Sequence, residues 1–72
     1  MEAYNMGLSY AKLWKLLIDK KMSAADLRKA INVAPNTMTK MRQDQIVSLA
    51  VLMKICDELD CDFGDIVSYV RE

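Results

Sequence analysis

The sequence predicts an all-α fold, a compact bundle of five short helices, and three observations support it. Apolar residues recur three and four positions apart along successive segments, which is the spacing of one helix face. Leu, Met, Ala and Lys are frequent and favour helix, whereas the chain has only two Gly and one Pro. Aromatic residues make up 7%, fewer than strands usually carry. The 72 residues, 53% apolar and 28% charged, suit one globular domain.

The first helix is expected from residue 10 to residue 21, with Ser9 as its N-cap. Lys20 and Lys21 close it, because cations suit the negative end of the helix dipole. The apolar face of this helix consists of Tyr10, Leu13, Trp14, Leu17 and Ile18.

The second helix is expected to begin after Ser23. Ser23 and Asp26 have the spacing of a capping box, in which each side chain bonds a backbone N–H that the first turn leaves free. The inner face consists of Leu27, Ala30 and Ile31. At Asn32 the chain must turn, and Asn tolerates the left-handed conformation that such a turn requires.

The third helix is expected to begin at Pro35, because proline lacks the N–H that a first helical residue leaves unpaired. It continues to Arg42. Met38 and Met41 share one side, which burial should direct inward. The opposite, outward side carries Asn36, Thr39, Lys40 and Gln43.

The fourth and fifth helices are expected to follow Ser48 and Asp62, which act as their N-caps. Asp65 completes a second capping box with Asp62. The fourth helix is expected to bury Leu49, Leu52, Ile55, Cys56 and Leu59. The fifth is expected to bury Phe63, Ile66, Val67 and Val70.

The composition argues against a metal site, a cofactor or catalysis. The chain has no His and two cysteines, Cys56 and Cys61, which is too few for a zinc site. We interpret both cysteines as small buried apolar residues. Without His, a glycine-rich phosphate loop or a cysteine in a basic pocket, acid–base and nucleophilic chemistry have few candidates. We therefore expect no enzyme, no cofactor and no small-molecule ligand.

The chain also carries no sign of membrane insertion or export. Its most apolar run, Ile46 to Cys56, is about half of the roughly 20 residues that span a bilayer. The first nine residues lack the basic and apolar regions of a secretory signal. We expect a cytoplasmic protein with no membrane partner.

Charge is segregated along the chain although its formal total is zero. Residues 1–42 hold eight lysines and arginines against three acidic residues, and residues 43–72 hold two against seven. The halves thus carry net charges of +5 and −5. Because phosphates respond to the local field, this asymmetry favours a polyanion as partner of the first half.

The segment from Met22 to Arg42 predicts a helix-turn-helix. A capped helix ends at Asn32, a three-residue turn follows, and the next helix has a polar outer side. In this arrangement the first helix crosses the DNA backbone and the second enters the major groove. Val33, within the turn, is expected to act as an apolar plug that holds the two helices at a constant angle.

The stretches MSAADLRKAINVAPNTMTKM and VSLAVLMKICDELDCDFGDIV together resemble the phage-repressor and Cro-like (XRE-type) helix-turn-helix family. The resemblance spans roughly residues 9–70 and implies a lambda-repressor-like DNA-binding fold. The helix-turn-helix domain would cover residues 9–72 and follow a tail of residues 1–8. Three positions depart from the family pattern: Ala24 replaces a common Gln, Asn32 a usual Gly, and Arg42 a usual Glu.

The resemblance implies a transcriptional regulator, such as a repressor, that binds double-stranded DNA. The positions that read base edges in this family are Pro35, Asn36, Thr39 and Lys40. Asn can pair with adenine and Lys with guanine, and a Thr methyl can contact the thymine methyl. The expected phosphate contacts are Ser23, Arg42, Gln43, Lys12 and Lys15.

A homodimer is expected, because one such module covers only roughly 600–1,000 Å² of surface on DNA and is seldom specific alone. The alternative is a protein-interaction module, such as an antitoxin-like accessory regulator, that keeps the helix-turn-helix without strong DNA binding. Ala24 and the neutral total favour this alternative, and Tyr69 and Val70 in the acidic half could form its partner surface.

Overall fold

A computed structural model describes residues 7–71, and this part of the chain forms four α-helices and one 3-10 turn. The bounds are Ala11–Asp19 (α1), Ala24–Ile31 (α2), Pro35–Arg42 (α3), Leu49–Leu59 (α4) and Phe63–Asp65 (η1). The all-α class is therefore confirmed, whereas the count of five helices is wrong. Of the expected N-terminal tail, residues 1–6 lie outside the described residues.

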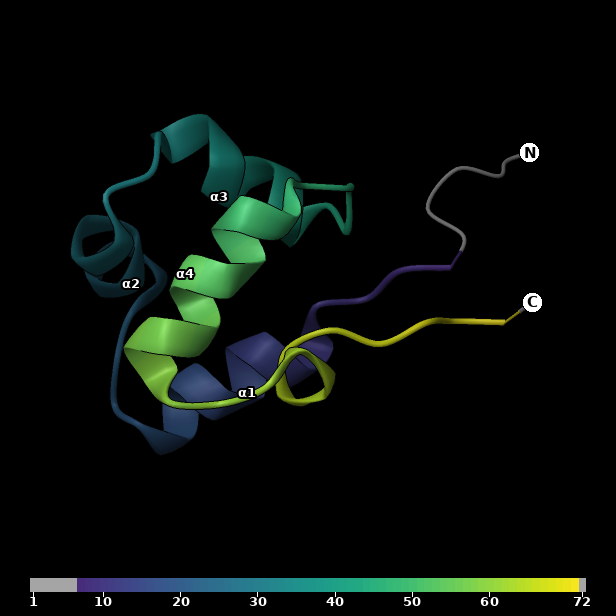
Figure 1. Ribbon diagram of the computed structural model, residues 1–72, viewed down its shortest axis with the longest axis horizontal. Helices are drawn as coiled ribbons and strands as arrows, with labels where there is room; N and C mark the ends of the chain where they lie inside the picture. Colours follow the sequence, from purple (N-terminus) through teal and green to yellow (C-terminus); the bar gives the residue numbers. More distant parts are fainter. Residues whose placement is uncertain (1–6, 72) are drawn as a thin grey trace.

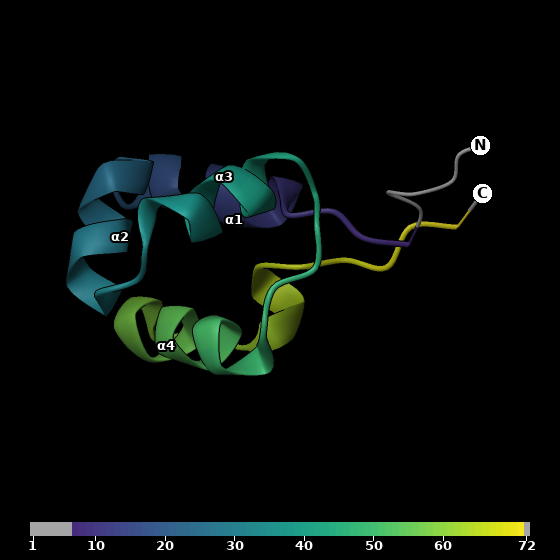
Figure 2. The ribbon, with the colours of Figure 1, turned by 90° about the horizontal axis from the view of Figure 1, so that it is seen from above.

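The helices form two layers. Figure 2 shows α1, α2 and α3 on one side and α4 with η1 on the other. In Figure 1, α3 lies at the top of the molecule and α1 at the bottom, with α4 crossing between them against α2. No helix in the described part of the chain is long and apolar enough to cross a membrane.

The core lies between the two layers, and the buried residues of the described part of the chain are all hydrophobic. Met41, Leu13, Leu27, Ile55 and Ile66 are fully buried. Met38 and Met41 point inward as expected, which leaves the polar side of α3 outward. Five residues expected inside are instead exposed: Ile18, Ala30, Leu49, Phe63 and Val70. Ile18 and Leu49 stand in the last and the first turn of their helices, where no described element covers them.

The local capping signals are confirmed at three helix starts. Ser23 and Asp26 form the expected capping box, and the Ser48 side chain accepts a hydrogen bond from the N–H of Val51. Pro35 occupies the first turn of α3. The N-cap of α1 is Tyr10 rather than Ser9, although the Ser9 hydroxyl does accept a bond from the N–H of Ala11 at 3.2 Å.

Helix α1 is also shorter than expected. It ends at Asp19, because Lys21 adopts a left-handed conformation with φ of 58°. The N–H of Met22 then bonds the carbonyl of Leu17 at 2.9 Å, the bond that closes a Schellman motif. The periodic pattern could not reveal this end, since no Gly marks it.

The fifth helix is replaced by a three-residue 3-10 turn, η1. Its capping box between Asp62 and Asp65 is present as expected. After Ile66 the chain becomes extended, and both backbone groups of Ser68 bond those of Ser9, at 3.0 and 3.1 Å. These bonds take up the groups that a continuing helix would need, so Phe63 and Val70 remain 40% and 41% exposed.

Candidate nucleic-acid interface

Helices α2 and α3 and the turn between them form the expected helix-turn-helix. Asn32 ends α2 in the left-handed conformation, with φ of 56°. Val33 packs half-buried against the core, in keeping with its expected role as an apolar plug. Its carbonyl accepts a 3.4 Å bond from the Arg28 guanidinium, which ties the turn back to α2. The angle between the two helices is thus set by both packing and hydrogen bonds.

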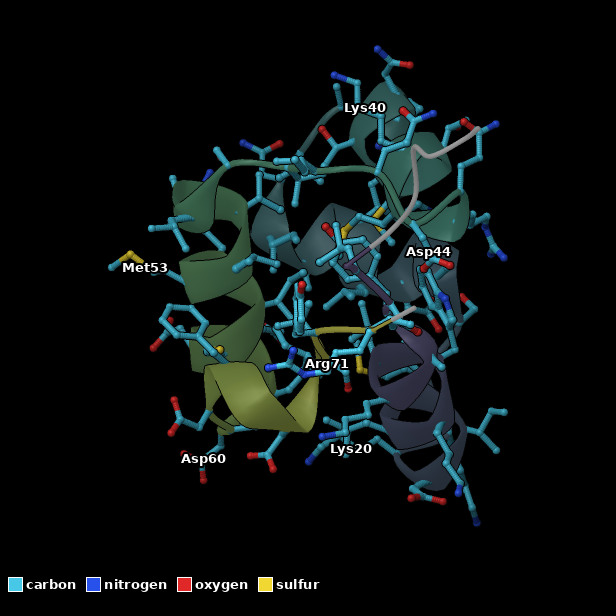
Figure 3. The ribbon with its side chains drawn as sticks, turned by 90° about the vertical axis from the view of Figure 1, so that its right-hand side faces the viewer. Lys20, Lys40, Asp44, Met53, Asp60 and Arg71 are labelled. Carbon is cyan, nitrogen blue, oxygen red and sulfur yellow. The ribbon has the colours of Figure 1, made fainter. Side chains whose placement is uncertain are left out.

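The outer side of α3 is polar and accessible. Pro35, Asn36, Thr39 and Lys40 are all exposed, so the structure brings the four expected base-reading residues together on one surface. Figure 3 shows Lys40 at the edge of the molecule, pointing into solvent. The Thr39 hydroxyl lies 3.3 Å from the Pro35 carbonyl and donates to it. The hydroxyl is thereby occupied, and the Thr39 methyl is left as the group for apolar contact.

The loop after α3 is held by Tyr10, a contact that sequence reasoning missed. Tyr10 is 1% exposed, and its hydroxyl donates to the carbonyl of Gln45 at 2.8 Å. Its N–H donates to the Asp44 carboxylate at 3.0 Å. Burial raises the pKa of Tyr10 above its usual value, so the hydroxyl stays a donor. These bonds connect the start of α1 to the loop that ends α3.

The C-terminal end of α3 carries two of the expected phosphate contacts. Arg42 lies over the ring of Trp14, with 5.3 Å from its guanidinium carbon to the ring centroid. Arg42 stays exposed, so the stacking orients the guanidinium and leaves its N–H groups accessible. Gln43 is also exposed, and its side-chain oxygen accepts a 2.9 Å bond from the Gln45 amide.

Ser23, another of the expected phosphate contacts, is the N-cap of α2. Its hydroxyl oxygen accepts from the N–H of Asp26, and its own N–H donates to the Asp26 carboxylate, both at 3.0 Å. These bonds lower the pKa of Asp26 below its usual value. The N–H groups of Ala24 and Ala25 lie in this first turn, where backbone donors have no partner within the helix. A phosphate that binds here would be repelled by the negatively charged Asp26 carboxylate nearby.

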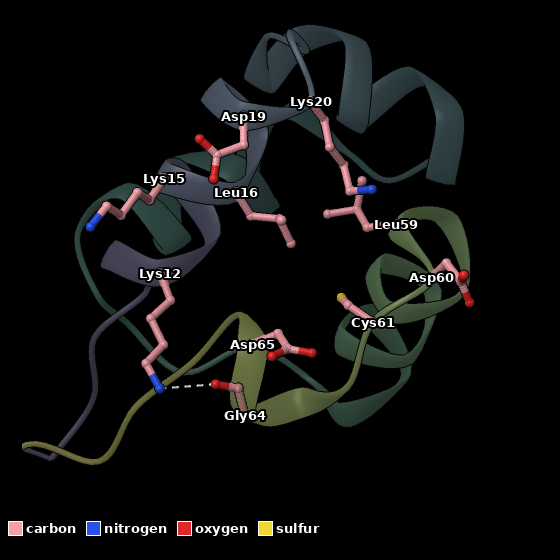
Figure 4. A pocket seen from close by; sticks show the side chains of 10 residues that line it. All are labelled: Lys12, Lys15, Leu16, Asp19, Lys20, Leu59, Asp60, Cys61, Gly64 and Asp65. Carbon is pink, nitrogen blue, oxygen red and sulfur yellow. Dashed lines mark hydrogen bonds between the residues drawn. The ribbon is translucent and has the colours of Figure 1, made fainter.

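Lys12 and Lys15 lie apart from the other expected contacts. The ammonium of Lys12 donates to the carbonyl of Gly64 at 2.9 Å, which directs the side chain to η1 (Figure 4). Lys12 stands two residues before Trp14, the residue that stacks with Arg42. This spacing places Lys12 about 160° around α1 from Trp14. Lys12 and Lys15 both line an open hollow of about 470 Å³ between α1, the end of α4 and η1. In Figure 1, α1, which carries both lysines, lies at the bottom of the molecule and α3 at the top.

The two cysteines meet at the end of α4. The N–H of Cys61 bonds the carbonyl of Cys56 at 3.0 Å, and both thiols are free and half-buried, as expected of small apolar residues. Burial raises the pKa of Cys61 to about 11. The described residues contain no group of three side chains that could hold a metal ion.

Comparison with known proteins identifies the domain. Residues 12–72 match the family model of the Cro/C1-type helix-turn-helix DNA-binding domain. The chain is also similar to the crystal structure of the transcriptional regulator VanUg, form II, with a TM-score of 0.89 and 46% sequence identity. That similarity covers 100% of this chain and 96% of the other. None of the curated proteins matches. The chain therefore belongs to the family of Cro/C1-type helix-turn-helix DNA-binding domains.

Proposed function

We propose that this protein is a transcriptional regulator that binds double-stranded DNA sequence-specifically and places α3 in the major groove. The observation that supports this most strongly is the two-sided nature of α3. Met38 and Met41 anchor the helix in the core, at 6% and 0% exposure, while its other side is polar and accessible. A helix held in this way presents its side chains to base edges in one constant orientation.

Each outward side chain of α3 has a separate role in this proposal. Asn36 both donates to and accepts from the edge of an adenine, and Lys40 donates to the edge of a guanine. Thr39 contacts a thymine methyl, because its hydroxyl is bonded to Pro35. Pro35 begins the helix and contributes an apolar contact at its start.

Phosphates flank this reading surface at both ends. Ser23 and the free N–H groups of the first turn of α2 bind one phosphate, since the helix dipole is positive there. Arg42 and Gln43 bind phosphate beyond the other end of α3. Lys12 and Lys15 line the hollow between α1, the end of α4 and η1, so in this proposal they strengthen the local positive field without direct contact.

The protein binds as a homodimer on two half-sites about one helical turn of DNA apart. The physical reason is the small size of one module on DNA, roughly 600–1,000 Å², which rarely gives specificity alone.

The test is selection from a random duplex library at about 0.1 M salt, followed by binding titrations of Lys40→Ala on the selected sequence. Loss of one base contact should weaken binding about 5- to 100-fold and relax the preference at one base pair. Lys20→Ala is the matched control, because Figure 3 shows Lys20 and Lys40 at opposite ends of the molecule. The control should bind within about twofold of the wild type, as an exposed site remote from the interface.

Salt dependence separates the two kinds of cation. Arg42→Ala should lower the slope of log affinity against log salt by about one, whereas Lys12→Ala and Lys15→Ala should leave it unchanged. If the library shows no enrichment, the protein-interaction alternative replaces this proposal.

A further inference from the structure

The C-terminal end of α4 brings the two cysteines of the chain together. Asp60 follows α4 in the left-handed conformation, with φ of 53°. The N–H of Cys61 then bonds the carbonyl of Cys56 at 3.0 Å, which is the bond that closes a Schellman motif. In this motif the side chains at these two positions frequently contact each other. The backbone bond that closes the helix thus also pairs two thiols.

The same backbone bond limits the distance between the two Cα atoms. With 3.0 Å between nitrogen and oxygen and standard bond lengths, the Cα atoms of Cys56 and Cys61 lie at most about 7 Å apart. Disulfides form at Cα–Cα distances of about 4.4–6.8 Å, and larger separations cannot be bridged unless the backbone moves. Both thiols are free. The fold therefore holds the pair at a separation that a disulfide can bridge.

One of the two thiols is accessible from solvent. Cys61 lines the open hollow of about 470 Å³ between α1, the end of α4 and η1. Figure 4 shows its sulfur pointing into this hollow. A small molecule that enters the hollow therefore meets Cys61 first. Cys56, half-buried beside it, is placed to react with whatever forms on the Cys61 sulfur.

The surroundings of the pair keep both thiols protonated. Burial raises the pKa of Cys56 above its usual value and that of Cys61 to about 11, and the carboxylate of Asp65 adds to both effects. Strongly oxidising disulfides arise where the protein stabilises a thiolate, since this favours the reduced form. No such stabilisation opposes a disulfide here. The raised pKa also makes exchange slow, on the scale of minutes to hours.

We infer that Cys56 and Cys61 form a thiol–disulfide exchange site, which a low-molecular-weight disulfide converts to an intramolecular disulfide. The Cys61 thiolate attacks one sulfur of the small disulfide, forms a mixed disulfide and releases one thiolate. The Cys56 thiolate then attacks the Cys61 sulfur and releases the second thiolate. The protein loses two electrons and two protons, which the small disulfide takes up as two thiols. Neither step involves DNA, so the site is independent of the proposed function.

The bridge stabilises the folded protein. It closes a loop of six residues, which limits the freedom of the unfolded chain. For a domain of this size the loop-entropy model corresponds to a Tm higher by about 5–15 °C. Figure 3 shows Asp60, which precedes Cys61, and Lys40 of α3 at opposite ends of the molecule. The bridge therefore acts on stability and leaves the outer side of α3 in place.

The experiment incubates folded wild type and the control Cys56→Ala with excess oxidised glutathione and measures intact mass without reductant. We expect wild type to lose two hydrogen atoms, to retain no glutathione and to form no disulfide between chains. The control lacks the second thiol, so it should retain one glutathione at Cys61. Circular dichroism of oxidised wild type should show the higher Tm, and dithiothreitol should reverse it.

A second measurement compares the folded with the unfolded chain and needs no variant. By linkage, the fold favours the disulfide by the same factor as the disulfide favours the fold. The equilibrium constant for oxidation of wild type by glutathione should therefore be at least about tenfold higher in buffer than in urea.

Three results would overturn the inference. Wild type that retains glutathione, or that links to a second chain, would show that the two thiols do not meet. Wild type that stays reduced at equilibrium with excess oxidised glutathione would show that the bridge does not form. An equilibrium constant equal to or lower than the value in urea would show that the fold opposes it.

Discussion

Tyr10→Phe should destabilise the protein although it removes a single oxygen atom. The substitution keeps the aromatic ring in the core and keeps the bond from the backbone N–H to Asp44. It removes the 2.8 Å bond from the hydroxyl to the carbonyl of Gln45. That carbonyl belongs to an exposed residue and can be rehydrated, so the loss lies near the typical net value of about 1 kcal/mol.

The expected change is measurable in a domain of this size. For 60–100 residues, 1 kcal/mol corresponds to a Tm lower by roughly 4–8 °C. Urea unfolding followed by circular dichroism should show a lower midpoint with an unchanged m-value. Tyr69→Phe is the control: it removes the same atom from a 72%-exposed side chain, so its effect should stay within about 0.5 kcal/mol.

The same substitution should also loosen the end of α3. The backbone N–H of Gln45 bonds the carbonyl of Lys40 at 2.9 Å, so the loop and the last turn of α3 move together. We expect faster amide exchange across residues 43–47 in Tyr10→Phe. Equal stability and equal exchange in Tyr10→Phe and Tyr69→Phe would refute the positioning role of Tyr10.

Three further outcomes follow from burial, capping and pKa. Met41→Ala, at a side chain of 0% exposure, should cost about 2–5 kcal/mol in urea unfolding, whereas Met53→Ala should cost less than about 0.5. Ser23→Ala should cost about 1 kcal/mol in urea unfolding, because it removes the N-cap oxygen. The folded state lowers the pKa of Asp26, so the ionised carboxylate stabilises the fold at pH values above the pKa of the unfolded state, and this contribution is lost as the pH falls through the pKa of the folded state. Alkylation of Cys61 in the folded protein should be slow at pH 8 and accelerate towards its pKa of about 11, while urea-unfolded protein reacts fast at pH 8; equal rates in both states would contradict the burial of this thiol.

Sequence reasoning succeeded where the determinants are local. The capping box of Ser23 and Asp26 spans three residues, and the left-handed turn at Asn32 depends on a single one. The inward direction of Met38 and Met41 follows from helical spacing alone. These features together define the helix-turn-helix, so its position and the exposure of its outward residues were predictable. The family match covers this segment within residues 12–72.

The features that could not be predicted depend on partners distant in sequence. Ile66 and Val70 have the spacing of a helix, but pairing of Ser68 with Ser9 extends the chain there. Lys12 resembles any solvated lysine until the carbonyl of Gly64 comes within 2.9 Å. Leu49 continues the apolar face of α4, and only the full arrangement of helices shows that nothing covers it.

The position of α3 is thus determined by residues other than those that would read the bases. Asn36 and Thr39 are poor residues for a helix interior, so the helix depends on its buried methionines and on the loop that Tyr10 holds. Exposed substitutions at Asn36 and Lys40 should consequently change stability by no more than about 0.5 kcal/mol while changing base preference. Specificity and stability are then carried by opposite sides of one helix. An Asn36 or Lys40 variant with a lower unfolding midpoint would show that the two sides are coupled.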